Sequence, residues 1–429
     1  MNEPDSHAAV ETRAAIEIVW RMEAPRLVAG LMRLVRDLGA AEDLAHDALV
    51  AALEQWPRDG VPRNPAAWLM AAARRRGIDQ LRRRSMQARK HDGLARELDE
   101  AIRVGDAPDE PAGADDIGDD LLRLMFIACH PVLPADARVA LTLRLLGGLT
   151  TDEIARAFLV PEPTIAQRIV RAKKTLAKKQ VPFEVPAPAE RMVRLASLLE
   201  VIYLVFNEGY AASTGDDWMR PALCDEAMRL GRTLTTLIPA EAEVHGLVAL
   251  MELQASRFGA RLGPKGEAIL LLEQDRNRWD RLLITRGLAA LDRAVALDGG
   301  GGFYALQAGI AACHARAATP AATDWARIAA LYARLVDVTR SPIVRLNHAV
   351  AVGMAQGPAA GLVLVDALAT DTSLRAYPYL TAARGDLLER LGRLDEARAA
   401  FTQAASLARN TRDRDVLLAR ARRRATTSP

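Results

Sequence analysis

Residues 64–84 read NPAAWLMAAARRRGIDQLRRR, a stretch whose pattern predicts one amphipathic helix. Asn64 suits the N-cap, and Pro65 suits the first helical position, where its missing N–H leaves no hydrogen bond unmade. Apolar residues recur at helical spacing, and they are Ala67, Leu69, Met70, Ala73, Ile78 and Leu81. The remaining surface is basic and carries Arg74, Arg75, Arg76, Arg82, Arg83 and Arg84.

The basic surface of this helix has two interpretations. Clustered arginines neutralise phosphates, which favours contact with nucleic acid. Trp68 precedes the cluster, where an aromatic ring can stack on an unpaired base. A solvated basic face with a core tryptophan explains the same residues without DNA. The surrounding sequence has to decide between these interpretations.

The composition of the whole chain predicts an all-α protein. Half of its 429 residues are hydrophobic and only 4% are aromatic. Long runs lack glycine, proline and clusters of β-branched residues, as helical proteins do. The length is typical of about two to four domains. The formal net charge of +3 is nearly balanced, so the charged segments are more informative than the total.

The sequence also predicts a cytoplasmic protein without a metal ion. Cys129, Cys224 and Cys313 are widely spaced and form no metal-binding pattern with histidine, which favours buried free thiols in a reducing compartment. The first residues, MNEPDSHAAVETR, lack the basic and apolar order of a signal peptide. No apolar run reaches the length of a membrane span. We therefore expect no membrane contact and no cofactor.

Two further helices are predicted ahead of the basic helix, over residues 16–37 and 41–56. Gly39 suits the C-terminal end of the first helix. Glu42 and Asp43 suit the first turn of the second, AEDLAHDALVAALEQW, because the helix dipole favours acids there. The turn-rich segment PRDGVPRNP then leads into the basic helix.

This order of helix, loop and basic helix resembles domain 2 of the extracytoplasmic-function (ECF) sigma factors of bacterial RNA polymerase, and we expect that domain over residues 1–90. The resemblance implies that the second helix docks on the clamp coiled coil of core polymerase through Asp43, Leu44 and Asp47. It also implies that the loop and the basic helix open the −10 promoter element and hold a flipped base. The implied −10 contacts are Arg63, Asn64, Trp68, Arg74, Arg75, Arg82 and Arg83.

Residues 91–117 predict an acidic, flexible linker, because aspartate and glutamate accumulate there among glycine, proline and alanine. A plain tether between two domains explains this composition. The resemblance offers a second interpretation, in which the linker runs through the polymerase cleft and imitates nucleic acid until RNA displaces it.

Residues 118–182 predict a helix-turn-helix. Thr150 and Glu153 form a capping box that opens a short helix, and a tight turn leads into a basic helix over residues 162–178. The expected core positions of the basic helix are Ile165, Ile169 and Val170. The pair resembles sigma domain 4, which reads the −35 element and binds the polymerase flap. The implied DNA contacts are Thr164, Gln167 and Arg168, with Arg171, Lys173 and Lys174 on phosphates.

Residues 183–429 predict a helical extension that begins at the proline-rich segment VPFEVPAPAE. Small and large residues around Gly385 and Phe401 have tetratricopeptide-like spacing, and we expect a repeat of this kind over about residues 288–429. The extension resembles that of a long ECF subgroup, with the segments FNEGYAAS from Phe206 and DRNRWD from Asp275. The polar residues of these segments suit either a joint polar site or helix caps and salt bridges, and capping is the simpler explanation.

Taken together, the sequence predicts a sigma factor that binds core polymerase, recognises −35 and −10 elements and promotes DNA opening. Its helical extension would modulate activity, through an intramolecular contact with the sigma domains if the two meet. The alternative is a helix-turn-helix regulator of duplex DNA with a helical-repeat sensor or protein-interaction domain. An enzyme is not expected, because the sequence carries no phosphate-binding glycine loop, catalytic carboxylate pair or nucleophile motif.

Overall fold

The structure is a computed structural model that describes residues 4–88, 114–210, 219–263, 269–408 and 411–422. Every regular element in these ranges is a helix, so the all-α prediction is confirmed. Contacts between residues divide the chain into two compact units, residues 1–237 and residues 238–429. The predicted acidic linker falls largely on residues 89–113, which lie outside the described ranges.

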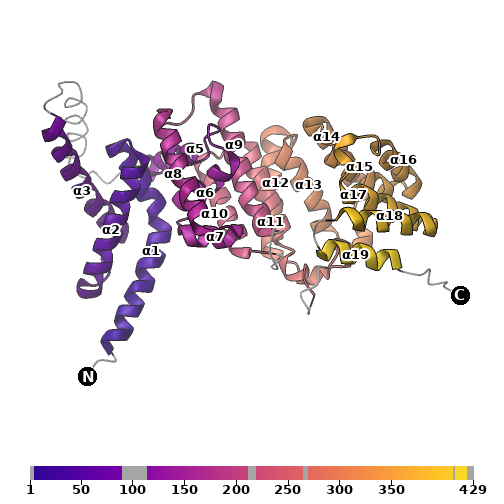
Figure 1. Cartoon of the computed structure of the whole chain (residues 1–429), viewed down its shortest axis with the longest axis horizontal. Helices are drawn as coiled ribbons and strands as arrows, with labels where there is room; N and C mark the ends of the chain where they lie inside the picture. The colour runs from indigo at the N-terminus through magenta and orange to yellow at the C-terminus, as the bar shows by residue number, and fades with distance from the viewer. Residues whose placement is uncertain (1–3, 89–113, 211–218, 264–268, 409–410, 423–429) are drawn as a thin grey trace. The chain divides into compact units, whose positions relative to one another are not determined.

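The first unit opens with three helices that pack against one another, α1 (Pro4–Val35), α2 (Leu38–Asp59) and α3 (Pro65–Ala88) (Figure 1). The prediction that Gly39 ends the first helix is wrong. Arg36 makes the break with a left-handed φ of 52°. The Asp37 carboxylate then caps α2 by accepting a 2.7 Å hydrogen bond from the Ala40 N–H. An aspartate is a better N-cap than the residues that follow it, so α2 begins earlier than its apolar pattern indicates.

Helix α3 matches the prediction at its start and in most of its buried face, although Ala67 is exposed and Met70 is half-buried. The Asn64 Oδ1 atom accepts a 3.1 Å hydrogen bond from the Ala67 N–H, which confirms the N-cap. Gly77 lies in the middle of the helix, where glycine costs about 1 kcal/mol relative to alanine. A Cβ atom at Gly77 would lie 3.0 Å from Leu34 Cδ2 and 3.1 Å from Leu44 Cδ1. The glycine therefore lets α3 pack closely on α1 and α2.

The next four helices of the first unit form the predicted helix-turn-helix and its support: α5 (Ala114–Ala128), α6 (Ala135–Leu145), α7 (Thr151–Phe158) and α8 (Glu162–Lys178). Leu159 ends α7 in a left-handed conformation with a φ of 49°, and Pro161 precedes α8. The bounds of α8 are the predicted ones. Residues 114–117, assigned to the linker by composition, form the first turn of α5.

Helices α9 (Pro188–Tyr210) and α10 (Pro221–Leu237) complete the first unit. The Arg194 guanidinium donates a 2.9 Å hydrogen bond to the Phe126 carbonyl of α5. The Ser197 hydroxyl donates a 2.6 Å hydrogen bond to the Cys129 carbonyl just after α5. Helix α9 also buries a long apolar face, made of Leu195, Leu198, Leu199, Val201, Ile202, Val205 and Phe206. The first two helices of the predicted extension thus belong to the same unit as the helix-turn-helix.

The second unit is a succession of helices, each packed on its neighbours along the chain. They are α11 (Ala242–Ala255), α12 (Arg281–Asp298), α13 (Phe303–Arg316), α14 (Trp325–Thr339), α15 (Pro342–Ala355), α16 (Pro358–Leu368), α17 (Pro378–Arg390), α18 (Leu394–Leu407) and α19 (Thr411–Arg422). Helical repeats pack in this one-dimensional manner, and the tetratricopeptide interpretation stays a prediction. Between α11 and α12, the described residues include single 3-10 turns at Phe258–Ala260, Leu271–Glu273 and Arg276–Arg278.

Glycine fixes how closely the helices of the second unit approach. A Cβ atom at Gly385 of α17 would lie 2.9 Å from Cε1 of Phe401 in α18. Phe401 is 1% exposed, and its ring lies 4.4 Å below the Arg420 guanidinium of α19. Gly385 and Phe401, whose spacing suggested a repeat, therefore lie at the contact between the consecutive helices α17 and α18.

Candidate nucleic-acid and polymerase interface

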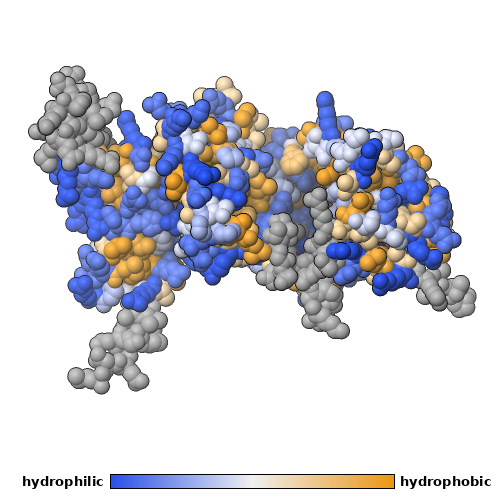
Figure 2. All heavy atoms as spheres, viewed as in Figure 1, coloured by the Kyte–Doolittle hydropathy of each residue, from blue (hydrophilic) through white to orange (hydrophobic). Residues whose placement is uncertain are grey.

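The basic surface of α3 is open to solvent over most of its length, and Figure 2 shows its visible face as largely hydrophilic. Five of the predicted −10 residues are exposed, and they are Arg63, Asn64, Arg75, Arg82 and Arg83. Arg74 is half-buried. Arg75 Nε donates a 3.2 Å hydrogen bond to the Ala71 carbonyl, and the Arg82 guanidinium lies 3.9 Å from Asp79 Oδ1. Exposed guanidinium groups of this kind suit a polyanion.

Trp68 is half-buried against a second tryptophan. Its ring centroid lies 5.4 Å from that of Trp56 at an interplanar angle of 69°, an edge-to-face contact. Trp56 itself lies in α2 and is 2% exposed. The sequence offered a core tryptophan or a base-stacking one, and Trp68 combines a packed edge with an accessible part.

The predicted polymerase contacts on α2 divide between surface and core. Asp43 and Asp47 are exposed. Leu44 is 4% exposed and packs toward Gly77 of α3, so its side chain does not face solvent. The reason is helical geometry: Leu44 lies on the side of α2 that α3 covers. The Arg76 guanidinium of α3 reaches the Asp47 carbonyl and joins the two helices.

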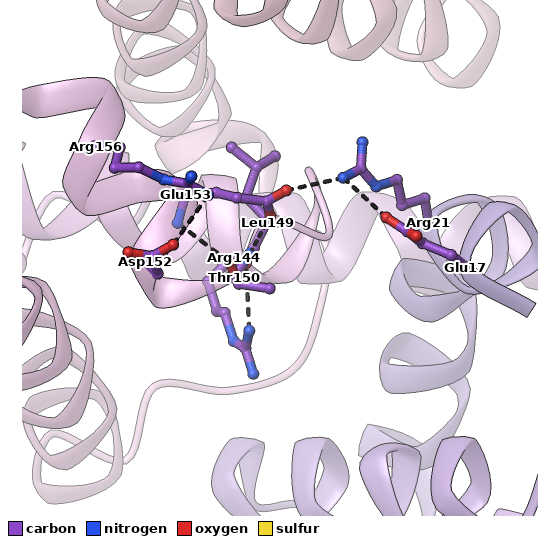
Figure 3. A network of polar contacts seen from close by, with 8 residues as sticks. All are labelled: Glu17, Arg21, Arg144, Leu149, Thr150, Asp152, Glu153 and Arg156. Atoms are coloured by element: carbon purple, nitrogen blue, oxygen red, sulfur yellow. Dashed lines mark hydrogen bonds and ion pairs between the residues drawn. The ribbon is translucent and has the colours of Figure 1, made fainter. Parts of the chain in front are cut away.

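The capping box that opens α7 is present as predicted (Figure 3). The Thr150 hydroxyl accepts a 3.1 Å hydrogen bond from the Glu153 N–H, and Glu153 Oε2 accepts a 2.8 Å hydrogen bond from the Thr150 N–H. Arg21 of α1 lies 2.9 Å from the same carboxylate. Burial raises the pKa of Glu153, but the hydrogen bonds to Thr150 and the charge of Arg21 hold it below its ordinary value.

Replacing Thr150 by alanine should destabilise the first unit by about 1 kcal/mol, because N-cap substitutions of this kind typically cost that much. Thermal or denaturant unfolding would measure the change. Thr151→Ala is the matched control, since Thr151 is adjacent but lies inside the helix. An equal loss in the two variants would contradict the role of the Thr150 hydroxyl.

The basic helix α8 exposes part of the predicted −35 set. Gln167, Arg171 and Lys174 are exposed, and Thr164 is half-buried. Arg168 Nε lies 3.1 Å from Asp136 Oδ2 of α6. Lys173 forms an ion pair with Glu42 of α2.

The core face of α8 is mostly as predicted. Ile165 and Ile169 are buried, whereas Val170 is 49% exposed, so the prediction for Val170 is wrong. Val170 follows Ile169 by one residue, and a rotation of about 100° along an α-helix carries it off the core face.

The two polar segments of the extension serve local structure within their own units. Glu208 pairs with Arg220 in the first unit. In the second, Asp275 caps a 3-10 turn and Asp280 caps α12. Arg276 is 6% exposed and donates to the carbonyls of His314 and Ala317 and to the Thr323 hydroxyl. Capping and tethering therefore account for these residues.

The three cysteines are buried free thiols, and burial raises the pKa of Cys129 to about 12. Among the described residues, no group of three or more histidine, cysteine, aspartate or glutamate side chains is placed to hold a metal ion. None of the described helices is long and apolar enough to cross a membrane.

Three family models match the chain in order. Residues 19–86 match Sigma-70 region 2, which spans most of α1 through α3. Residues 123–176 match Sigma-70, region 4, and this match begins within α5 and ends within α8. Residues 194–295 match a family of unknown function, DUF6596, and this match begins in α9 and runs into the second unit. No solved structure matches the chain.

One relative matches this chain over nearly the full length of both proteins. The chain is 45% identical over 396 residues to "Uncharacterized protein R00370" of Rhizobium meliloti (strain 1021), and the match covers 92% of each chain. Proteins of the Sigma-70 family are transcription initiation factors and not enzymes. With the basic helix α3 and the helix-turn-helix of α7 and α8 in one unit, the matches identify the chain as an ECF-like RNA polymerase sigma factor of the Sigma-70 family with a C-terminal helical extension.

Proposed function

We propose that this sigma factor binds bacterial core polymerase through the exposed acids of α2, reads promoter DNA through α8 and α3, and promotes opening of the −10 element. The observation that carries this proposal is the exposure of cationic side chains on both helices, at Arg63, Arg75, Arg82 and Arg83 around α3 and at Arg171 and Lys174 on α8. Both sets belong to the regions that the Sigma-70 models match. The −10 and −35 roles of individual residues are part of the proposal.

Helix α8 suits the major groove of the −35 element. Its first turns carry Thr164, Gln167 and Arg168, and the N-terminal part of a recognition helix contacts base edges. Gln167 suits adenine and Arg168 suits guanine, because each can make two hydrogen bonds to one base. Arg171, Lys173 and Lys174 lie further along and suit phosphates.

Helix α3 suits a melted −10 element. Its exposed arginines offer positive charge along the path of a single strand, and Trp68 offers the accessible part of its ring to a base. Base–aromatic stacking is worth about 1–3 kcal/mol per base. That gain offsets the few kcal/mol that extruding a base typically costs.

The extension contributes in two ways under this proposal. Helix α9 supports region 4 through the contacts of Arg194 and Ser197. The successive helices of the second unit form a repeat-like surface, and such surfaces commonly bind a peptide or another domain. We therefore assign modulation of sigma activity to the second unit.

Run-off transcription tests the proposed function. Purified bacterial core polymerase would be incubated with a pool of genomic promoter fragments, with and without the protein. We expect transcripts that start downstream of one shared pair of sequence motifs and that require the protein. Sequence-specific binding to duplex DNA without any polymerase-dependent transcript would instead favour a helix-turn-helix regulator.

Replacing Arg168 and Arg82 should have different effects on DNA binding. Arg168→Ala should relax the preference at one duplex position and cost about 1–3 kcal/mol at the correct base. Arg82→Ala should weaken binding to all sequences. It should also reduce the slope of log binding constant against log salt concentration by about 0.9, the contribution of one phosphate contact. Affinities for a set of single-base promoter variants at several salt concentrations would measure both effects. A uniform loss in both variants would contradict the assignment of α8 as the recognition helix.

A further inference from the structure

Glu42 is a buried acid on α2, the helix assigned to polymerase. Its residue surface is 7% exposed. Its Oε1 atom lies 2.9 Å from Arg144 Nε of α6, and its Oε2 atom contacts the Lys173 ammonium of α8. One region 2 carboxylate thus holds two region 4 cations, one of them on the recognition helix.

His46, one turn after Glu42, contacts one of these cations, Arg144. Its Nδ1 atom lies 2.9 Å from the Glu42 carbonyl oxygen, and its Nε2 atom lies 2.9 Å from Arg144 Nη2. A guanidinium only donates hydrogen bonds, so Nε2 accepts and the Nδ1–H donates to the carbonyl. Arg144 is therefore held by side chains at two positions of α2. We call these contacts the clasp: Glu42 with Arg144 and Lys173, and His46 with Arg144.

The clasp joins regions 2 and 4 together with two other ion pairs of the first unit. Arg21 of α1 lies 2.9 Å from Glu153 of α7 (Figure 3), and Arg33 of α1 lies 3.4 Å from Asp120 of α5. The Arg21 and Arg33 side chains are about half-exposed, at 54% and 51%. Exposed pairs contribute little to stability because solvent screens them. The Asp120 carboxylate is also buried, but it pairs with Arg123 of its own helix as well. Glu42 is distinctive because both of its cations come from region 4.

Glu42 carries a full negative charge at neutral pH. Burial raises the pKa of its carboxyl, but Lys173 and Arg144 lower it by more, so the net pKa lies below the ordinary value. A buried carboxylate with two cationic partners presents them with the same chemistry as a phosphate oxygen. The contact is built into the fold, since Glu42, His46 and Arg144 fix one another.

We propose that Glu42 stands in for a DNA phosphate and holds Lys173 away from promoter DNA until region 4 separates from region 2. The proposal rests on the proposed function, because it takes Lys173 as a phosphate contact of the −35 element. One ammonium group cannot engage the Glu42 carboxylate in this geometry and a phosphate of a bound duplex as well. DNA binding and the clasp therefore compete for the same lysine.

The competition has a structural consequence for α2. When region 4 separates from region 2, Glu42 loses both Arg144 and Lys173, and a carboxylate without these cations is stable only where water reaches it. Release of region 4 then exposes the part of α2 around Glu42 and His46, beside the exposed Asp43 and Asp47. Loading of region 4 onto DNA and exposure of the polymerase-facing helix would occur together.

The reactivity of Lys173 toward an amine-acylating reagent tests the clasp without DNA. Lys173 has 23% of its side chain exposed and is paired, whereas Lys174 and Lys178 of the same helix are exposed. Mass spectrometry of the full-length protein should show Lys173 reacting several-fold more slowly than Lys174. Glu42→Gln should bring the two rates together, and Glu54→Gln, an equal charge change at an exposed position of α2, should not. Equal rates for Lys173 and Lys174 in the unmodified protein would overturn the clasp.

Affinity for duplex promoter DNA tests the competition. Glu42→Gln should tighten binding by up to about tenfold relative to Glu54→Gln. The plot of log binding constant against log salt concentration should become steeper by about 0.9, the contribution of one added phosphate contact. Lys173→Gln should weaken binding strongly in the Glu42→Gln background and little in the unmodified chain. Equal losses in both backgrounds would overturn the proposal.

The two measurements separate this inference from the proposed function. Protection of Lys173 that is lost in Glu42→Gln, together with no binding of any variant to promoter DNA, would contradict the DNA-binding role of region 4. It would therefore also overturn the inference that Glu42 replaces a phosphate. Tight promoter binding by all variants, with an unprotected Lys173, would retain the proposed function and reject the clasp alone.

Discussion

Ending the chain at residue 185 should unfold the region 4 helices, whereas ending it at residue 237 should leave them folded. The shorter chain lacks α9 and α10, and with them the buried apolar face of α9 and the hydrogen bonds from Arg194 and Ser197. Each buried side chain of leucine or phenylalanine size is worth about 1.5–3 kcal/mol. Several such losses equal the whole stability of a typical domain, about 5–15 kcal/mol.

Hydrogen exchange and thermal unfolding of the two truncated chains would measure this difference. Amides of α6 and α8 should exchange rapidly in the chain that ends at residue 185 and remain protected in the chain that ends at residue 237. Protection in both chains would show that region 4 needs no support from α9. The longer truncation is also the suitable one for testing regulation by the second unit, because it removes that unit and keeps the first unit whole.

Trp56→Ala should be among the most destabilising single substitutions in region 2. Trp56 is 2% exposed and is one of the largest fully buried side chains of the protein. Its removal leaves a cavity between α2 and its neighbours, and tryptophan-to-alanine changes in cores typically cost about 3–5 kcal/mol. The substitution also removes the edge-to-face partner of Trp68. Denaturant unfolding would measure the loss of stability.

Trp68→Ala is the informative comparison, because Trp68 is half-buried and lies at the proposed −10 surface. It should cost less stability than Trp56→Ala but weaken binding to single-stranded −10 DNA by about 1–3 kcal/mol, the usual worth of one base stacked on an aromatic ring. Trp68→Phe should restore part of that binding. Unchanged affinity in Trp68→Ala would leave Trp68 with a packing role only.

Features governed by neighbouring residues were readily predicted from the sequence. The Asn64 cap, the Thr150–Glu153 capping box and the bounds of α8 each depend on residues within one or two turns of one another. The burial of Leu69, Ala73, Ile78 and Leu81 follows from helical periodicity alone. The order of the two sigma regions could also be predicted, since region 2 carries its basic helix and region 4 its helix-turn-helix within short stretches of sequence.

Errors arose where a local rule had competitors nearby. Gly39 is a plausible helix end by its type, but Asp37 is the stronger N-cap and Arg36 adopts the left-handed turn. The first residues of α5 are acidic, and their composition predicted a linker. They instead form the N-terminal end of an apolar helix. Acidic side chains are favourable there because of the helix dipole. In both cases the sequence contained the signal, and a neighbouring signal outweighed it.

The sequence by itself determined that the chain is helical, which helices are basic, and where caps begin α3 and α7, because these properties depend on contacts within a few residues. Tertiary structure alone decided that Leu44 is buried and that Lys173 forms an ion pair with Glu42. It also decided that α1 and α2 pack closely against α3 at Gly77. Arg144 and His46 are 98 residues apart in sequence and 2.9 Å apart in space. Helical periodicity assigns a side chain to a face of its own helix, whereas only the packing of distant helices determines what that face meets.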